Sequence, residues 1–185
     1  MTITEAESPR LLLPGMANFQ PGVERYRITG GAVTAVLLGA GDRLEVIDPE
    51  GCQPVEVAAF DRDGKSDPGL LGESSGSPSI GIASILAANQ HDARRVADAL
   101  ADKGIDLGAA TAVHLFSPDS PAGGTAQLTA EADVVCVIGV TGGDMVPHEQ
   151  NPPTDVVAFV HRTATPAPGL EILPTPLADK GIDLG

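Results

Sequence analysis

Short segments rich in valine, leucine and isoleucine, separated by turn-forming residues, constrain this chain more than any other feature. Runs of about six such residues between glycine, proline and aspartate are typical of β-strands. The pattern predicts strands at 32–38, 43–48, 54–60, 112–116, 125–129, 133–140 and 155–161. The first three follow one another closely and are predicted to form a β-meander, in which neighbours in sequence pair within one sheet.

One segment changes from the alternation of strands to a helical period. Asn89 is suited to cap a helix over Gln90–Lys103, and Gly104 is suited to end it. The predicted apolar stripe of this helix consists of Ala93, Val96, Ala97 and Leu100. We therefore expect a β-rich α+β fold: a single domain of antiparallel or mixed strands, barrel-like or sandwich-like, with one main helix near 90–103.

Polar and proline-rich ends frame the predicted domain. Residues 1–22 are interpreted as an N-terminal arm, 23–162 as the domain, and 163–185 as a proline-rich linker with a C-terminal tail. The tail LADKGIDLG repeats Leu100–Gly108 letter for letter, and the sequence offers no structural reason for it. Inside the domain, Asp61–Pro78 is rich in turn formers and charges, which predicts a mobile loop that could act as a lid.

Composition argues against several classes of partner. The formal net charge of −14 would repel the phosphates of nucleic acid and anionic membrane surfaces, so neither is expected as a partner. The sequence shows no N-terminal signal pattern and no apolar run of about 20 residues, which favours a cytoplasmic location. At 185 residues the chain is long enough to bury a core without disulfide or metal support.

The segment Glu131–Arg162 is the best candidate for a site. Two apolar strands there flank a Gly-rich and Pro-rich loop that holds Asp144, His148 and Glu149. A carboxylate and an imidazole could meet in this loop, but one histidine without a second histidine or a cysteine nearby is a weak pattern for zinc, which takes three or four ligands. The glycines that follow Thr141 match no phosphate-binding motif.

The other histidines have structural explanations beside functional ones. His91 and Asp92 stand at the predicted helix start, where capping accounts for the aspartate. His114 lies within a predicted strand, where we expect a half-exposed position, and His161 ends the last strand, where we expect it to be solvated. No catalytic, cofactor-binding or metal-binding residue is assigned. The pocket candidates are His91, His114, Asp144 and His148.

Two cysteines limit the thiol chemistry of the chain. Cys136 lies in the apolar run VVCVIGV, where a thiol is expected to be an inert core residue. Cys52 stands at a turn and has no neighbour in sequence that would lower its pKa. We expect neither a structural disulfide nor catalysis by either thiol.

A further set of residues forms an ordered pattern from Tyr26 to Arg162. It consists of Gly30-Gly31, Gly41-Asp42-Arg43-Leu44, Asp48, Glu50-Gly51, Gln53, Phe60, His91-Asp92, Lys103-Gly104-Ile105, Leu115-Phe116, Asp144-Met145 and Asn151-Pro152-Pro153-Thr154. The pattern resembles the urea carboxylase-associated family, and Asp48 to Gln53 is similar to the "D-x-E-G-x-Q" turn of that family. Larger proteins with such domains resemble trimethylamine N-oxide demethylases, in which the domains precede a folate-binding domain like the glycine-cleavage T-protein. The proline-rich exit after Arg162 looks like the junction that follows the first such domain.

The resemblance implies a metal site from which this chain departs. Active members of the family bind a metal through cysteines, one of them in a C-P-Q-D segment before the final strand. Here Thr141-Gly142-Gly143-Asp144 stands at that place, and no cysteine follows His91-Asp92. Without these thiolates the soft ligands for zinc are missing. We therefore expect no cofactor in this domain, whereas zinc and tetrahydrofolate would belong to a full-length parent.

These observations lead to three hypotheses about function. The first is a non-catalytic, degenerate N-terminal module of a one-carbon demethylase or aminomethyltransferase-type protein, which packs on catalytic domains or subunits of the same system or forms homo-oligomer contacts. The second is a subunit of a small amidine or urea-type hydrolase similar to carboxyguanidine deiminase, with a pocket built from His91, His114, Asp144 and His148. The third is a small-molecule sensor domain with Asp61–Pro78 as its lid.

Overall fold

The structure is a computed structural model that describes residues 22–88, 91–141 and 153–163. Its first sheet is antiparallel, with four strands in the order β1-β9-β3-β7. The bounds of these strands are Val23–Ile28 for β1, Val156–His161 for β9, Arg43–Asp48 for β3 and Gly124–Thr129 for β7. The sheet therefore joins the two ends of the described chain, because β1 and β9 pair along their whole length.

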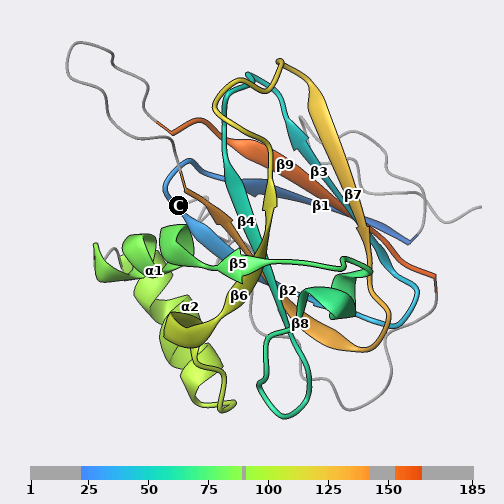
Figure 1. The fold of residues 1–185 in the computed structure, drawn as a ribbon, viewed down its shortest axis with the longest axis vertical. Coiled ribbons are helices and arrows are strands. Elements are labelled where there is room, and N and C mark those ends of the chain that lie inside the picture. Colours follow the sequence, from blue (N-terminus) through green and yellow to red (C-terminus); the bar gives the residue numbers. More distant parts are fainter. Residues whose placement is uncertain (1–21, 89–90, 142–152, 164–185) are drawn as a thin grey trace, which may run out of the picture.

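The second sheet has five strands in the order β2-β8-β4-β6-β5 and lies across the first (Figure 1). Its strands are β2 (Val33–Leu38), β8 (Val134–Val140), β4 (Val55–Phe60), β6 (Thr111–Leu115) and the short β5 (Ser77–Pro78). All of its pairings are antiparallel. The expected β-rich, sandwich-like α+β fold is thus confirmed, and the strands predicted from the sequence lie within one or two residues of the observed ones.

The predicted β-meander is wrong, because the three consecutive strands β2, β3 and β4 do not share one sheet. β1 and β3 belong to the first sheet, and β2 and β4 belong to the second. β2 and β4 carry buried residues on both faces, so each is stable only between two packed layers. β3 alternates between buried and more exposed residues, as a strand does when it covers the core with one face only.

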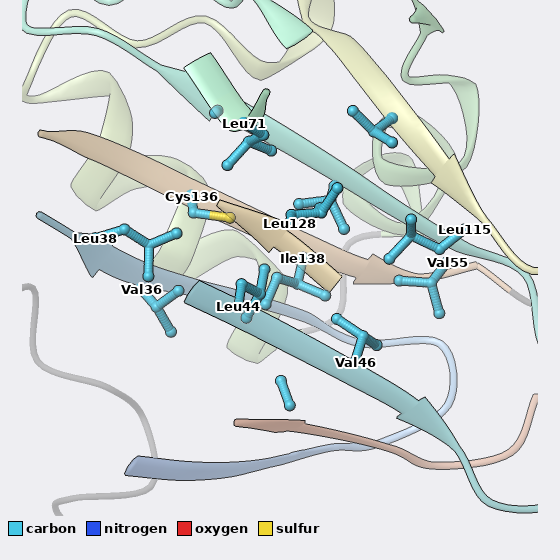
Figure 2. Packing of buried hydrophobic residues seen from close by; sticks show 14 of the residues in the cluster. Val36, Leu38, Leu44, Val46, Val55, Leu71, Leu115, Leu128, Cys136 and Ile138 are labelled. Atoms are coloured by element: carbon cyan, nitrogen blue, oxygen red, sulfur yellow. The ribbon is translucent and has the colours of Figure 1, made fainter. Parts of the chain in front are cut away.

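The main hydrophobic core fills the space between the two sheets. Figure 2 shows side chains of both sheets in this space, among them Val36, Leu44 and Ile138. Cys136 lies among these side chains and is fully buried, which confirms the prediction of a core thiol. The sandwich therefore owes its stability to aliphatic packing between two sheets.

A second core lies on the outer face of the second sheet, which two helices cover (Figure 1). These are α1 (Ile80–Ala87) and α2 (His91–Ala101). The predicted stripe of α2 is confirmed, since Ala93, Val96 and Leu100 are buried in this core and Ala97 packs against it. The helix ends as predicted: Gly104 adopts a φ of +77°, and its N–H donates to the Ala101 carbonyl at 2.9 Å. The predicted cap residue, Asn89, lies outside the described residues.

Helix α1 was not expected, because only one main helix was predicted. Its N-cap residue, Ser79, makes no capping hydrogen bond through its side chain, so the usual sequence signal for a helix start is weak. The partner that satisfies its first amide groups comes from β4, 25 residues earlier in the chain. Such a long-range cap leaves no local trace in the sequence.

The segment Asp61–Pro78, which was predicted as a mobile loop, contains a 3₁₀ helix and a short strand. The Asp61 carboxylate accepts hydrogen bonds from the backbone N–H groups of Asp63 and Lys65, each at 2.9 Å. The 3₁₀ helix η1 (Pro68–Leu71) follows, and it places Leu71 in the main core at 1% exposure. The segment then supplies strand β5. Leu71 and β5 therefore attach the segment to the sandwich.

Apart from Gly22 and Thr163, the predicted arm and the proline-rich tail, including the second copy of LADKGIDLG, lie outside the described residues. The first copy ends α2 and leads into the 3₁₀ helix η2 (Leu107–Ala109). Among the described residues, no helix has the length and apolar character needed to cross a membrane.

Candidate functional site

The structure describes the side chain of one of the four predicted pocket residues. Asp144 and His148, like the neighbouring Glu149, lie outside the described residues. His91 begins α2, but its side chain and that of Asp92 are also outside the described part, so the predicted capping role of Asp92 stays a prediction. His114 lies on β6 and is the residue around which a site can be built.

Three residues of the pattern that carries the resemblance, Asp48, Gly51 and Gln53, form a turn just before β4. The carboxylate of Asp48 is fully buried and accepts from the N–H of Gly51 at 2.8 Å and of Gln53 at 3.0 Å. Gly51 has a φ of +84°, and a Cβ there would lie 2.6 Å from the backbone nitrogen of Ala122, so only glycine fits. The "D-x-E-G-x-Q" pattern is thus explained by the shape of this turn.

The same turn fixes both neighbours of the predicted site loop. Before it, the N–H of Thr141 donates to the Pro54 carbonyl at 3.2 Å. After it, the N–H of Thr154 donates to the Gln53 side-chain oxygen at 2.7 Å. The chain therefore leaves and re-enters the described structure beside the start of β4.

One strand farther along, Glu56, His114 and Ser77 form a polar cluster that we call the Glu56 corner. Glu56 of β4 and His114 of β6 are direct cross-strand neighbours. The Nδ1 atom of His114 lies 3.9 Å from a carboxylate oxygen of Glu56. The Nε2 atom of His114 lies 2.7 Å from the hydroxyl oxygen of Ser77, on the adjacent edge strand β5. The imidazole thus stands between a carboxylate and a hydroxyl group.

Glu56 is held rigidly although it carries a charge in a buried position. Its side chain is 7% exposed, and its two oxygens accept from the N–H groups of Gly81 and Ile82, each at 2.8 Å. These are the first amide groups of α1, where the helix dipole favours a negative charge. Glu56 was not predicted as a site residue, although it is the one charged residue in the otherwise apolar strand Val55–Phe60.

The surroundings of His114 favour one tautomer. The nearby Glu56 carboxylate attracts a proton to Nδ1, which leaves Nε2 as the acceptor for the Ser77 hydroxyl group. The side chain of His114 is 45% exposed, which confirms the expected half-exposed strand position. The corner therefore combines a hydroxyl group that can act as a nucleophile, an imidazole that can act as its base, and a carboxylate that orients the imidazole.

A second polar cluster, which we call the Arg162 cluster, lies where the two ends of the domain meet. Arg162, immediately after β9, donates to both carboxylate oxygens of Glu24, to Asp42 at 2.8 Å and to the carbonyl of Leu37 at 2.6 Å. Burial alone would lower the pKa of Arg162, but these two carboxylates raise it overall. Arg162 was not predicted to have any role, because its partners lie more than 100 residues away in sequence.

The same cluster shifts the pKa values of its acidic members. Burial would raise the pKa of Glu24 and of Asp42, yet hydrogen bonds from Arg162, together with the N–H of Thr163 for Asp42, hold both below their usual values. Burial and the hydrogen bond to Glu24 raise the pKa of Tyr26 to about 12. Every charge here has a partner, so the cluster is structural.

His161, next to this cluster, is less solvated than expected. Its Nε2 atom lies 3.0 Å from a carboxylate oxygen of Glu45, and its side chain is 29% exposed. The pair joins two neighbouring strands of the first sheet, β9 and β3. We therefore assign His161 a structural contact.

The two thiols do not fit a zinc site. Burial raises the pKa of Cys136 to about 12, so this thiol resists forming the thiolate that zinc binds. Cys136 pairs with Ala59 in β4, whereas Cys52 precedes the start of that strand at Val55, and Val55 to Ala59 alone spans roughly 13 Å. Within the described residues, no three side chains of His, Cys, Asp or Glu lie close enough together to hold a metal ion.

Comparisons with known proteins give one clear sequence relative. The chain is 34% identical over 175 residues to a trimethylamine-oxide aldolase of Ruegeria pomeroyi. The match covers 94% of this chain but 22% of the relative, so the chain spans about a fifth of the length of that enzyme. No family model matches the chain.

A solved structure was also found, that of a DUF1989 family protein from Silicibacter pomeroyi. Its TM-score is 0.45 at 12% sequence identity, and the superposition covers 77% of this chain and 80% of that protein. A TM-score at this level supports no conclusion about function or fold.

Proposed function

We propose that this chain is a non-catalytic module of a one-carbon demethylase or aminomethyltransferase-type protein, of the urea carboxylase-associated kind. In this role it packs on the catalytic domains or subunits of the same system, or forms contacts between copies. The observation that carries the proposal is the match to the trimethylamine-oxide aldolase, which takes in nearly all of this chain and about a fifth of the enzyme. A unit that matches so small a share of an enzyme is more simply a building block than a complete catalyst.

The use of the polar residues in the fold supports a structural role. Asp48 and Gln53 belong to the pattern that resembles the family. Their side chains make hydrogen bonds within the turn before β4 and to Thr154. Asp42, another member of the pattern, is paired with Arg162. None of these groups is left to bind a substrate.

The positions of the two cysteines support the proposal that this module does not bind the metal of the family. Zinc held by cysteines needs thiolates that converge, and the two thiols of the chain lie at opposite ends of β4. Zinc or tetrahydrofolate would then be bound by other parts of a full-length parent.

Two alternatives are less well supported. An amidine or urea-type hydrolase would need His91, Asp144 and His148 to converge with His114, and of these only the His114 side chain is described. A small-molecule sensor would need a lid, and Asp61–Pro78 is bound to the sandwich through Leu71 and β5.

A chimera tests the proposal. The trimethylamine-oxide aldolase of Ruegeria pomeroyi is prepared with this chain in place of its own matching segment, and consumption of trimethylamine oxide is measured. We expect activity within about tenfold of the parent enzyme, and the same activity when the chimera carries His114→Gln or Ser77→Ala. A loss of more than about 100-fold on His114→Gln, the range expected for loss of a general base, would contradict the proposal.

A further inference from the structure

The Glu56 corner has a property that a scaffold does not need. Ser77 Oγ and His114 Nε2 are 2.7 Å apart, which is within the range for a nucleophile and its general base. A surface serine is ordinarily hydrogen-bonded to water or to the backbone. Here its partner is an imidazole that is itself oriented from the other side by a carboxylate.

We propose that Ser77 is a nucleophile that accepts an acyl group from activated acyl donors, namely thioesters or aryl esters, with His114 as its base and Glu56 as the residue that positions His114. The site goes beyond the module role proposed above, because acyl transfer is not part of that role. Its three residues come from three neighbouring strands of one sheet, β5, β6 and β4.

Glu56 acts through His114 and not on a substrate. Both of its oxygens are fixed by the amide groups at the start of α1, so the carboxylate cannot turn away from the ring. At 3.9 Å it is too far from Nδ1 for a direct hydrogen bond, but close enough for its charge to favour the tautomer with Nδ1 protonated. In that tautomer the lone pair of Nε2 points to the Ser77 hydroxyl group.

Access to Ser77 is open. The residue is exposed and lies on β5, the edge strand of the second sheet. A small acyl donor can therefore reach its hydroxyl group from solvent.

The residue after Ser77 limits the substrate class. In serine hydrolases with a nucleophile elbow, the backbone N–H after the nucleophile stabilises the oxyanion. Here that residue is Pro78, which has no N–H group. An unactivated ester or amide would therefore react slowly, whereas a thioester or aryl ester has a leaving group good enough to need less help.

The step balances without a further reactant. The Ser77 oxygen forms a bond to the carbonyl carbon of the donor, and its proton passes to His114 Nε2. The bond from that carbon to the thiolate or aryloxide then breaks, and the leaving group takes the proton from His114. The products are acyl-Ser77 and a free thiol or phenol.

Labelling with p-nitrophenyl acetate tests the proposal. The full chain is treated briefly, digested, and the rate of acetylation at Ser77 is compared by mass spectrometry with that at Ser75, an exposed serine of the same segment. We expect Ser77 to react at least about 100-fold faster, as general-base catalysis predicts. Equal rates at Ser77 and Ser75 would overturn the proposal.

Variants of His114 and Glu56 test the role of each residue. His114→Gln should reduce the rate at Ser77 to that at Ser75, and an unchanged rate would also overturn the proposal. For Glu56, the nitrogen-15 chemical shifts of His114 report the tautomer directly: we expect the Nδ1-protonated form in the native chain and a mixture in Glu56→Gln. The same tautomer in both would remove Glu56 from the site. None of these measurements involves trimethylamine oxide, so their failure would leave the module role untouched.

Discussion

The Arg162 cluster and the Glu56 corner are built from the same kinds of groups, a carboxylate and a basic side chain, and yet they differ in how completely those groups are paired. In the Arg162 cluster, the side chain of Arg162 is 12% exposed, and its guanidinium group bonds to Glu24, Asp42 and a backbone carbonyl. In the Glu56 corner, the side chain of His114 is 45% exposed, and its imidazole has a hydroxyl group at hydrogen-bond distance.

This difference in pairing indicates which of the two clusters is structural and which can react. A network in which every charge is paired through hydrogen bonds fixes geometry and leaves no group free to react. A base that is fixed on one side and open to solvent on the other retains the ability to exchange a proton. We therefore expect substitutions in the Arg162 cluster to change stability, and substitutions of His114 and Ser77 to change reactivity.

The largest effect is expected for Arg162→Ala. The substitution leaves the Asp42 side chain, which is 4% exposed, without its charged partner, and we expect the free energy of unfolding to fall by about 3–5 kcal/mol. Denaturation with urea measures it. Arg62→Ala is the matched control, because Arg62 pairs with Asp133 at 77% exposure and should change stability by less than about 0.5 kcal/mol. Equal losses of stability in both variants would show that the buried Arg162–Asp42 pair contributes no more to stability than the exposed Arg62–Asp133 pair.

Glu56→Ala should give a smaller loss of stability. It removes the acceptor for two amide groups of α1, and we expect a cost of about 2 kcal/mol in the same urea experiment. Glu56→Gln keeps one acceptor oxygen and should lose clearly less. If the two variants were equally stable, the hydrogen bonds to α1 would not be what holds Glu56 in place.

The tyrosine of the Arg162 cluster offers a measurement that depends on pH. Tyr26 is the one tyrosine in the sequence, so the ultraviolet absorbance of phenolate reports it alone. We expect a midpoint at about 12 in the native chain. Because the folded pKa is raised above the usual value of about 10, the stability contributed by Tyr26 is complete below pH 10 and is lost as the pH rises toward 12. Glu24→Gln should move the midpoint back toward 10, and an unchanged midpoint would rule out the hydrogen bond as a cause.

The smallest effects on stability are expected for Ser77→Ala and His114→Gln. Both side chains are exposed, and neither supports the core, so each variant should unfold within about 0.5 kcal/mol of the native chain. Thermal unfolding followed by circular dichroism measures this. A loss of 2 kcal/mol or more would make the Glu56 corner a structural network like the Arg162 cluster.

The sequence was sufficient for seven of the strands and for α2, but not for β1, β5 and α1, nor for the arrangement of the strands. Strands such as Val134–Val140 could be predicted because most of their residues are β-branched. The sheet order could not, because it depends on which strands are buried on both faces. Val55–Phe60 is buried on both faces and Arg43–Asp48 on one face only. This difference can be recognised in the sequence only if a sandwich of two layers is already assumed. Helix α1 was missed because its cap, Glu56, comes from another element.

The candidate site was less predictable, since its groups are brought together by strand pairing. His114 was considered for its residue type, but Glu56 and Ser77 are 58 and 37 positions away from it. The register between β4 and β6, and between β5 and β6, creates the contacts. Arg162 was overlooked for the same reason, because Asp42 lies 120 positions earlier in the chain.

The most direct test of the module role is turnover of trimethylamine oxide by the purified 185-residue chain alone. The account predicts no consumption above a blank without protein, in the presence or absence of added zinc and tetrahydrofolate, whereas the chimera with the rest of the aldolase consumes it. Consumption by the isolated chain, lost on His114→Gln, would contradict the account and make the Glu56 corner the active site of an enzyme.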